Sequence, residues 1–415
     1  MYKYIVLLIG GGALAQHTPI MTNEGMLSIS PKTEVATLFD FQNHKNATVS
    51  NDGTIYFYSD FQNEGLFTFD SDKKSSYAVF QTYNGQAKNQ RLSGMAPTYF
   101  YDILFNDQSG TSGFDLQNDI SIAGTANFNA GVVEVDADAG AVVFLQGAKH
   151  VNTSDKSHVR GKVERVGNNE FAFPVGDGGH YRPAIISKVP HLKDVFFSEY
   201  HLENSNAKYP HLTIDSDQIE LINDKEFWTI DRGNTKNDVV LTLTWDEKTT
   251  PSYILDGYGQ VLHIVRWDKD KNMWIDEGGI VDKSLKTVTI PTTINGYGVF
   301  TFAKVKEKQV EHIIIYNAVS PNGDGINDYF IIENIEQFPN NTVQIYNRWG
   351  VKVFGTTNYN TSGNVFNGVS DGRGTLQKSD NLPTGTYYYI ITYEYTDSSG
   401  THTVKKAGYL HLENN

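Results

Sequence analysis

The loop from Ser320 to Asp328 carries residue types that could bind calcium. Its sequence, SPNGDGIND, alternates side-chain oxygens with glycine, as a tight Ca²⁺ loop requires. An EF-hand is excluded, because Ser320 stands where the first Asp would be and Ile331 stands at the twelfth position. The same residues also fit a hydrogen-bonded Asx turn, and both interpretations stay open. The candidate calcium ligands are Asn322, Asp324, Asn327 and Asp328.

Histidines and carboxylates are the other groups that could carry chemistry. No two histidines have the H-E-x-x-H spacing and cysteine is absent, so a zinc site would need residues from distant positions. Glu170 with Asp177, or Asp276 with Glu277, could act as a glycosidase pair across a cleft, although acidic loop residues are ordinarily solvated. We therefore expect no enzyme and no cofactor other than calcium. The histidines in the middle of the chain are His150, His158, His180, His191, His201 and His211.

Aromatic side chains offer a third kind of site. Trp267 and Trp274 flank an expected turn, and Tyr253 and Tyr258 precede it. Such rings could stack on sugars at the surface, or the tryptophans could fill a hydrophobic core. The sequence leaves both alternatives open.

The composition limits which elements can position these residues. The chain has 415 residues, which suggests two or three domains at about 150 residues each. A formal net charge of −14 disfavours nucleic acids and anionic membranes as partners. The 37 Gly, 24 Tyr and 23 Phe residues, with no Cys, are typical of many short strands joined by turns. We therefore predict an all-β protein.

The first fifteen residues resemble an export signal. One lysine precedes an apolar run from Ile5 to Ala15, which ends in Ala-Leu-Ala and is too short to span a bilayer. The pattern predicts a secretory signal peptide over residues 1–15, with cleavage between Ala15 and Gln16.

The remainder divides into regions by strand length. Residues 16–161 hold short strand-like pieces with Gly or Asn at the corners, which fit a β-solenoid or a sandwich. Residues 162–306 hold longer alternating runs with Trp, which favour an immunoglobulin-like sandwich. The charged run at 307–312 is expected to be a linker before a last domain at 313–415.

Four sequence blocks define the last domain. They read SPNGDG from Ser320, NRWG from Asn347, PTGTY from Pro383, and GY at Gly408. In this order at the chain end, they resemble the gliding-motility-associated C-terminal domain, the type B sorting domain of type IX secretion cargo in Bacteroidota. The matching residues are Ser320, Pro321, Asn322, Gly323, Asp324, Gly325, Asn347, Arg348, Trp349, Gly350, Pro383, Gly385, Tyr387, Gly408 and Tyr409.

The resemblance implies an immunoglobulin-like fold and transport across the outer membrane to the cell surface or the medium. It also implies two partners, the type IX translocon and an outer-membrane barrel of the PorP/SprF family. For the body we expect a non-catalytic adhesion, display or gliding-associated role. The alternative is a secreted carbohydrate-binding or carbohydrate-degrading protein that binds a surface glycan.

Overall fold

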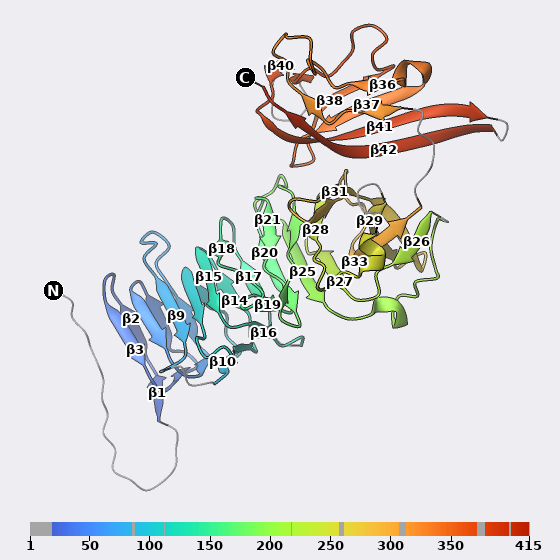
Figure 1. Ribbon diagram of the computed structural model, residues 1–415. Helices are drawn as coiled ribbons and strands as arrows, with labels where there is room; N and C mark the ends of the chain where they lie inside the picture. The colour runs from blue at the N-terminus through green and yellow to red at the C-terminus, as the bar shows by residue number, and fades with distance from the viewer. Residues whose placement is uncertain are drawn as a thin grey trace. The chain divides into compact units, whose positions relative to one another are not determined.

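A computed structural model describes residues 19–84, 88–111, 113–138, 140–216, 218–256, 261–306, 313–371, 378–397 and 400–414. The predicted signal peptide, its Ala15/Gln16 cleavage site, Tyr258 and the 307–312 linker lie outside these residues. The described chain is almost entirely strand, so the predicted all-β class is confirmed (Figure 1). It forms two compact units. The first contains the residues up to Ala184 with Val189–Glu203 and Glu226–Asn237, and the second contains Ile185–Lys188, Asn204–Lys225 and Asp238–Asn415.

The first unit is built on a parallel β-solenoid of about six turns, one of the two predicted alternatives. Each turn contributes one strand to each of three parallel sheets. The first sheet contains β1 (Ile20–Asn23), β4 (Asp40–Asn43), β7 (Phe61–Asn63), β10 (Gln90–Ser93), β13 (Phe114–Leu116), β16 (Val133–Val135) and β19 (Val159–Arg160). The second contains β2 (Met26–Ile29), β5 (Thr48–Asn51), β8 (Leu66–Thr68), β11 (Thr98–Phe100), β14 (Ile120–Ile122), β17 (Val142–Phe144) and β20 (Val163–Val166). The third contains β3 (Glu34–Thr37), β6 (Thr54–Phe57), β9 (Tyr77–Gln81), β12 (Asp102–Asn106), β15 (Thr125–Ala130) and β18 (Lys149–Val151).

The turns of the solenoid differ in length, which hid the repeat in the sequence. Strands of the first sheet begin at residues 20, 40, 61, 90, 114, 133 and 159, so no two successive intervals are equal. Several continuous β-like runs of the sequence form two strands each. The run from Tyr99 to Phe105, for example, is divided at Tyr101 into β11 and β12, which belong to different sheets.

Phenylalanine side chains fill the interior along the third sheet. Phe57, Phe80, Phe105 and Phe128 come from four successive turns, and all are fully buried. Neighbouring rings are stacked, with centroids 4.9, 6.2 and 5.4 Å apart along the series. Residues in register on parallel strands lie at the strand spacing of about 4.8 Å, so identical rings can stack from turn to turn.

An asparagine ladder lines the corner after the first sheet. The Nδ2 of Asn23 donates to Oδ1 of Asn43 (2.9 Å), and Nδ2 of Asn43 donates to Oδ1 of Asn63 (2.8 Å). The Nδ2 of Asn63 then donates to Oγ1 of Thr98 (2.9 Å) and to the carbonyl of Pro97 (3.2 Å). Both Asn43 and Asn63 are fully buried, so the ladder supplies partners for polar groups that water does not reach.

The stack of parallel strands continues through β20, past residue 161, where we expected the boundary between the first two regions. Beyond β20, the second sheet is extended by the antiparallel strands β25 (Val195–His201) and β27 (Phe227–Arg232). Trp228 is buried on β27 and its Nε1 donates to the carbonyl of Arg182 (2.9 Å). The short strands β21 (Phe171–Phe173), β22 (Gly176–Asp177) and β23 (His180–Tyr181) complete this unit.

The buried His150 gives the last turn a predicted sensitivity to acid. Its ring contacts Phe128, Phe144 and Phe171, and burial lowers its pKa below the ordinary value. A histidine with a lowered pKa contributes stability above its unfolded-state pKa near 6.5, and this stability is lost as the pH falls through the folded-state value.

We therefore expect the melting temperature to fall between pH 7.5 and pH 5.5, and to fall less in a His150→Phe variant. Circular dichroism melting curves at the two pH values measure the difference. His191→Phe, at an exposed position, is the matched control. An equal acid shift in His150→Phe and in the unmutated protein would contradict the assignment.

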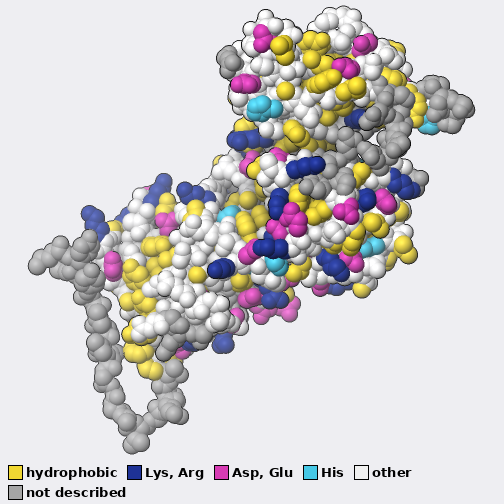
Figure 2. Space-filling view, viewed as in Figure 1, with side chains coloured by type: hydrophobic (Ala, Val, Ile, Leu, Met, Phe, Trp, Pro, Cys, Tyr) yellow, Lys and Arg dark blue, Asp and Glu magenta, His cyan; other side chains and the backbone are white. Residues whose placement is uncertain are grey.

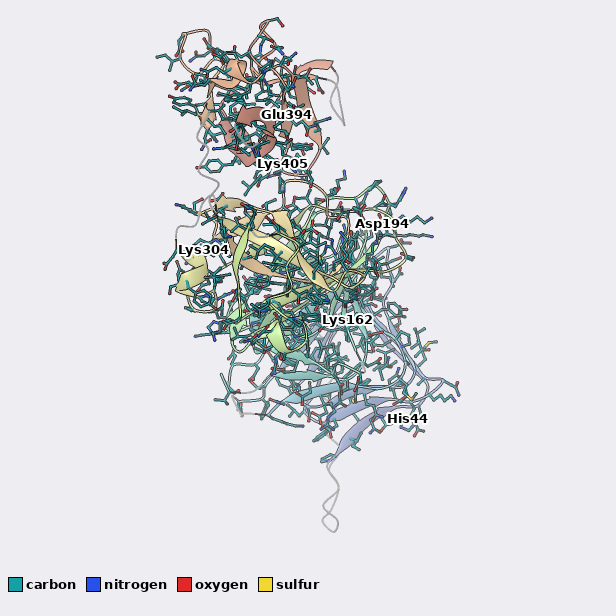
Figure 3. The ribbon with its side chains drawn as sticks, turned by 90° about the vertical axis from the view of Figure 1, so that its right-hand side faces the viewer. His44, Lys162, Asp194, Lys304, Glu394 and Lys405 are labelled. Atoms are coloured by element: carbon teal, nitrogen blue, oxygen red, sulfur yellow. The ribbon has the colours of Figure 1, made fainter. Side chains whose placement is uncertain are left out.

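The second unit contains two antiparallel sheets before the last domain. One contains β26 (Ile219–Ile222), β33 (Gly298–Val305), β29 (Leu262–Asp268) and β30 (Met273–Gly278), and Lys304 marks β33 in Figure 3. The other contains β28 (Leu241–Thr244), β32 (Thr287–Thr289) and β31 (Ile280–Asp282), and β29 contacts β31 and β32 across the interior. The remaining elements are β24 (Ala184–Ile186), the 3₁₀ helix η1 (Ser205–Ala207) and α1 (Ser252–Leu255). No helix in the described part of the chain is long and apolar enough to cross a membrane.

The C-terminal domain is organised around one five-stranded sheet. Its order is β35 (Ala318–Val319), β42 (Gly400–Leu412), β41 (Gly385–Asp397), β37 (Asn341–Tyr346) and β38 (Lys352–Thr357). The long hairpin of β41 and β42 carries Glu394 and Lys405 on its two strands (Figure 3). Two short pairs and a 3₁₀ helix complete the domain: β34 (Ile314–Ile315) with β36 (Ile332–Glu333), β39 (Val369–Asp371) with β40 (Lys378–Asn381), and η2 (Ile335–Gln337).

Candidate functional site in the C-terminal domain

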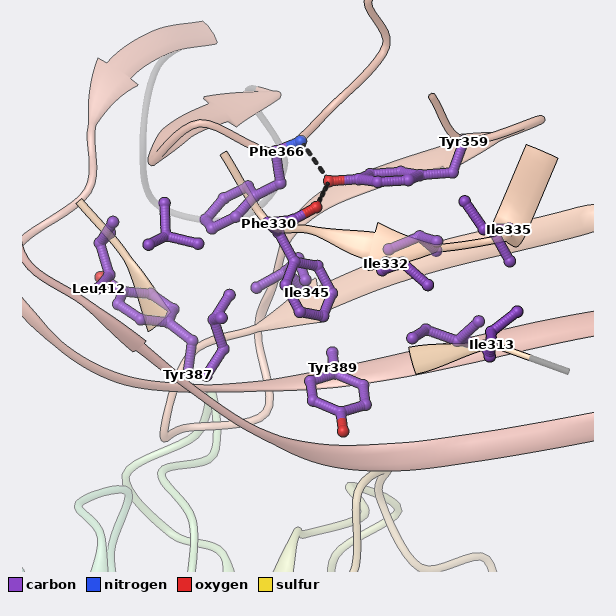
Figure 4. Packing of buried hydrophobic residues seen from close by; sticks show 14 of the residues in the cluster. Ile313, Phe330, Ile332, Ile335, Ile345, Tyr359, Phe366, Tyr387, Tyr389 and Leu412 are labelled. Carbon is purple, nitrogen blue, oxygen red and sulfur yellow. Dashed lines mark hydrogen bonds between the residues drawn. The ribbon is translucent and has the colours of Figure 1, made fainter. Parts of the chain in front are cut away.

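The core of the C-terminal domain contains tyrosines with satisfied hydroxyls. Tyr359 is fully buried, and its hydroxyl donates to the carbonyl of Phe330 (2.6 Å) and accepts from the backbone N–H of Phe366 (3.0 Å) (Figure 4). Burial raises the pKa of Tyr359, and burial likewise raises the pKa of Tyr389 to about 12. These groups therefore remain neutral at physiological pH and serve the packing of the domain.

Two of the motif blocks hold this core together. Tyr387 is buried and its hydroxyl donates to the carbonyl of Pro383 (2.8 Å), which closes the turn that leads into β41. Gly408 lies opposite Tyr389 in the β41–β42 ladder. A Cβ at Gly408 would lie 2.3 Å from the Tyr389 hydroxyl, so a side chain there would displace a core tyrosine. Residues of both blocks therefore stabilise the core of the domain.

The NRWG block forms a tight turn between β37 and β38. The side-chain Oδ1 of Asn347 accepts the N–H groups of Trp349 and Val351, both at 3.0 Å. Gly350 has a φ of +71°, a backbone conformation that residues other than Gly and Asn rarely adopt. The turn holds the guanidinium of Arg348 4.5 Å from the centroid of the Trp349 ring, in a cation–π contact. Trp349 is 40% exposed, so the block presents a large aromatic side chain to solvent.

The loop from Ser320 to Asp328 is closed by its own side chains. The carboxylate of Asp328 accepts the N–H groups of Gly323 (2.7 Å) and Gly325 (2.9 Å) through its two oxygens. Asp324 accepts from Ile326 (2.7 Å) and from the Nδ2 of Asn322 (2.9 Å). The carbonyl of Asn327 accepts from the N–H of Ser320 (2.7 Å), while its side chain makes none of these contacts. This is the Asx-type network that the sequence offered as one alternative, and calcium binding by these residues stays a prediction.

Asp328 should matter for stability whether or not calcium is present. We expect Asp328→Ala to destabilise the C-terminal domain by about 2 kcal/mol, because two N–H groups lose a charged acceptor. Asp371→Ala, at a half-buried carboxylate outside the loop, is the comparison variant. Thermal unfolding in EDTA and in 1 mM Ca²⁺ measures both effects. A gain in melting temperature with Ca²⁺ that Asp328→Ala abolishes would establish a metal site, and equal curves would support the hydrogen-bonded loop.

The exposed part of the site comes from separate blocks. Besides Trp349, Tyr409 is 43% exposed. It lies opposite Tyr388 on β41, and Tyr388 lies opposite Tyr346 on β37. These three tyrosines form one row across the sheet. The sequence motif did not distinguish such surface residues from Tyr387 and Gly408, which serve the core.

Residues 313–412 match the model of the CHU_C type IX secretion signal domain. The C-terminal domain is a type IX secretion signal domain. No curated protein and no solved structure matches the chain. The type IX secretion signal domain implies interaction with the type IX machinery and export to the cell surface or extracellular space.

The other candidate groups from the sequence lie outside the secretion signal domain. Trp267 and Trp274 face each other across the β29–β30 hairpin, where they are 7% and 0% exposed. Both fill the core and neither can stack on an external sugar. Tyr253 is partly exposed, and its hydroxyl donates to Asp224 (2.5 Å).

Most of the carboxylates that could form a glycosidase pair contact basic side chains instead. Asp276 contacts Nδ1 of His263 (2.9 Å), and Glu277 accepts from Nε of Arg266 (2.6 Å). Asp177 pairs with Nε of Arg160 (2.8 Å), while Glu170 is exposed. Among the described residues, no three His, Asp or Glu side chains converge as a metal site would require.

The first unit also contains a cavity. It has a volume of about 270 Å³ and lies at the last solenoid turn, lined by Lys149, His150, Arg165, Glu170 and Phe171 among others. Arg165 is buried, and its guanidinium donates to the carbonyls of Gly167 and Asn169. Arg165 therefore holds the backbone at this turn, while Lys149 and Glu170 are exposed.

Proposed function

We propose that the solenoid body is a non-catalytic adhesion or display module, delivered to the cell surface by the secretion signal domain. The observation that carries this proposal is the combination of a stacked, fully filled solenoid with an export domain on one chain. Phenylalanine columns and the asparagine ladder make the solenoid rigid, and its three sheets present extended outer faces. Extended rigid faces suit recognition of large surfaces.

A test of this role removes the body and keeps the export parts. Cells that make a chain without residues 20–306 should still export the C-terminal domain but should attach less to surfaces than cells with the full chain. Attachment under flow measures the effect, and surface labelling verifies export. Equal attachment of the two strains would contradict an adhesive role and would favour a gliding-associated component, which colony spreading would reveal.

We further propose that the signal domain binds an outer-membrane barrel of the PorP/SprF type, so that the protein stays at the outer membrane. Support comes from Trp349, which is exposed although aromatic, and from the rigid turn that presents it. Affinity purification of the full chain from native outer membranes, followed by mass spectrometry, tests this partner. Recovery of a barrel of this type is expected, and recovery of translocon subunits alone would contradict it.

Trp349 provides a sharper test of the same contact. We expect Trp349→Ala to lower surface delivery several-fold with little change in melting temperature, because an exposed aromatic at an interface commonly contributes about 2 kcal/mol or more to binding. Tyr316→Ala is the matched control, since Tyr316 is 41% exposed in the same domain. Immunoblots of surface and periplasmic fractions measure delivery. Equal delivery of Trp349→Ala and Tyr316→Ala would exclude Trp349 from the contact.

A second candidate function is an exported carbohydrate-binding protein. The observation that favours it is a set of tyrosines on one outer face of the solenoid, where Tyr56 and Tyr58 lie with nearly parallel rings.

A further inference from the structure

One outer face of the solenoid carries an uncharged row. The third sheet points Ile55, Ala78, Ile103 and their equivalents inward, so the alternate residues point outward. The central outward row runs through six turns in register, and its members are Ala36, Tyr56, Val79, Leu104, Asn127 and Val151. Val79 is only 2% exposed, so the other five residues form the accessible part of the row. No member carries a charge, in a protein whose net charge is −14. We call this row and the tyrosines beside it the tyrosine face.

Tyrosine rings lie in the row and beside it at the N-terminal turns. The rings of Tyr56 and Tyr58 are 6.5 Å apart and inclined by only 14°. Tyr83 meets Tyr58 edge to face at 5.7 Å and is 46% exposed. Hydrophobic side chains also gather over the N-terminal solenoid turns in Figure 2. Aromatic rings fixed against one another lose little entropy when they bind a ligand.

Amide groups continue the face toward later turns. The Nε2 of Gln81 donates to the hydroxyl of Tyr58 (2.8 Å), and Nδ2 of Asn129 donates to Oδ1 of Asn106 (2.7 Å). The Nδ2 of Asn106 also donates a longer hydrogen bond to Oε1 of Gln81 (3.4 Å). These bonds fix the amides in one orientation, so that Asn129, which is exposed, offers polar atoms at a set position.

The other two outer faces have different chemistry. On the first sheet, Arg91, Asp115, Glu134 and Arg160 form an outward charged row in register. On the second, Ser28, Ser50 and Thr68 form a row of small hydroxyls, and Tyr99 lies opposite Ser121 further along. Tyrosine rings beside fixed amides are therefore particular to the third sheet. The outward row next to the central one does contain charges, at Glu34, Asp102 and Lys149, so only the central row is uncharged.

We propose that the tyrosine face binds an uncharged polysaccharide chain. The C–H faces of pyranose rings are apolar and pack on aromatic rings, while their hydroxyls exchange hydrogen bonds with fixed amides. An uncharged ligand matches a row without charges, and a repeating chain matches a surface that repeats at each turn. The proposal rests on the adhesive role given above and names the class of ligand.

Affinity electrophoresis of the exported full chain tests the proposal. Native gels contain laminarin, xyloglucan, galactomannan or mixed-linkage β-glucan as uncharged probes, and alginate as the charged one. We expect retardation in at least one uncharged gel and at least a fivefold weaker affinity in the Tyr56→Ala/Tyr58→Ala double variant. Tyr99→Ala is the matched control, because Tyr99 is an exposed tyrosine on another face. Melting curves verify that each variant is folded.

Three outcomes would overturn the proposal. These are no retardation in any uncharged gel, retardation in alginate alone, and equal retardation of the double variant and Tyr99→Ala. A second copy of the chain could occupy the tyrosine face instead, and light scattering tests this alternative. A dimer that is lost in the double variant would also overturn the glycan proposal. If cells without the body attach less but the purified chain binds no uncharged probe, the glycan proposal fails while the adhesive role stands. If the purified chain binds an uncharged probe but cells without the body attach normally, the glycan proposal stands while the adhesive role fails.

Discussion

Removal of residues 313–412 is expected to retain the protein in the periplasm and to abolish its appearance at the cell surface. The prediction follows from the match of these residues to the type IX secretion signal domain. The domain has its own hydrophobic core, built from residues between Ile313 and Leu412, so its loss leaves the solenoid core intact. Protease accessibility on whole cells and fractionation measure the location of the truncated chain.

A fusion provides the complementary control. A periplasmic reporter that carries a signal peptide and residues 313–415 should be exported, whereas the same reporter with Gly408→Val in the tail should not. The valine would lie against the Tyr389 hydroxyl, so the domain would not pack. Surface appearance of the truncated chain, or export of the Gly408→Val fusion at the normal level, would contradict the assignment.

Substitution of Asn63 by leucine should have the largest effect on the solenoid. We expect Asn63→Leu to lower the free energy of unfolding by about 3 to 5 kcal/mol, since each buried polar group left unpaired costs about 1 to 3 kcal/mol. The groups that lose Asn63 as a partner are Oγ1 of Thr98, the carbonyls of Ala96 and Pro97, and Nδ2 of Asn43, which keeps its bond to the carbonyl of Leu66. Leucine has a similar volume, so packing alone would not account for the loss. Urea denaturation followed by circular dichroism measures it.

Gln62→Leu is the matched control, because Gln62 is the adjacent residue on β7 but points outward and is only partly buried. We expect this variant to lose less than about 1 kcal/mol, as is usual for surface substitutions. Similar losses in the two variants would mean that the ladder contributes little beyond its volume. A Thr98→Val variant should show part of the Asn63 effect, since Thr98 receives one of the ladder bonds.

The sequence is most predictive where local chemistry is distinctive. The blocks at Asn347 and Pro383 combine residues that few other turns need, and the domain they marked is confirmed. The solenoid was one of two alternatives, because strands of two to six residues do not fix which strands pair. A visible signal was missed. The tetrapeptide DFQN occurs at Asp40–Asn43 and again at Asp60–Asn63, and it marks two successive steps of the asparagine ladder.

The exposure of particular side chains could not be predicted from the sequence. Trp267 and Trp349 are both next to a turn, yet Trp267 packs inside a hairpin and Trp349 is held outside one. The difference arises from long-range pairing of β29 with β30 and from the Asn347 contacts. Likewise, Tyr56 and Val79 are far apart in the sequence and become neighbours only because β6 and β9 pair in register.

The unequal spacing of the solenoid strands has a consequence for how such a protein can change. Each turn pairs only with the turn before and the turn after it, so the energy of the stack is a sum over neighbouring interfaces. Extra residues between strands need not alter those interfaces, since β10 pairs with β7 across the longest interval in the first sheet. Whole turns can therefore be gained or lost in evolution, and the reach of the molecule can lengthen or shorten, while the first turn and the export domain remain the same.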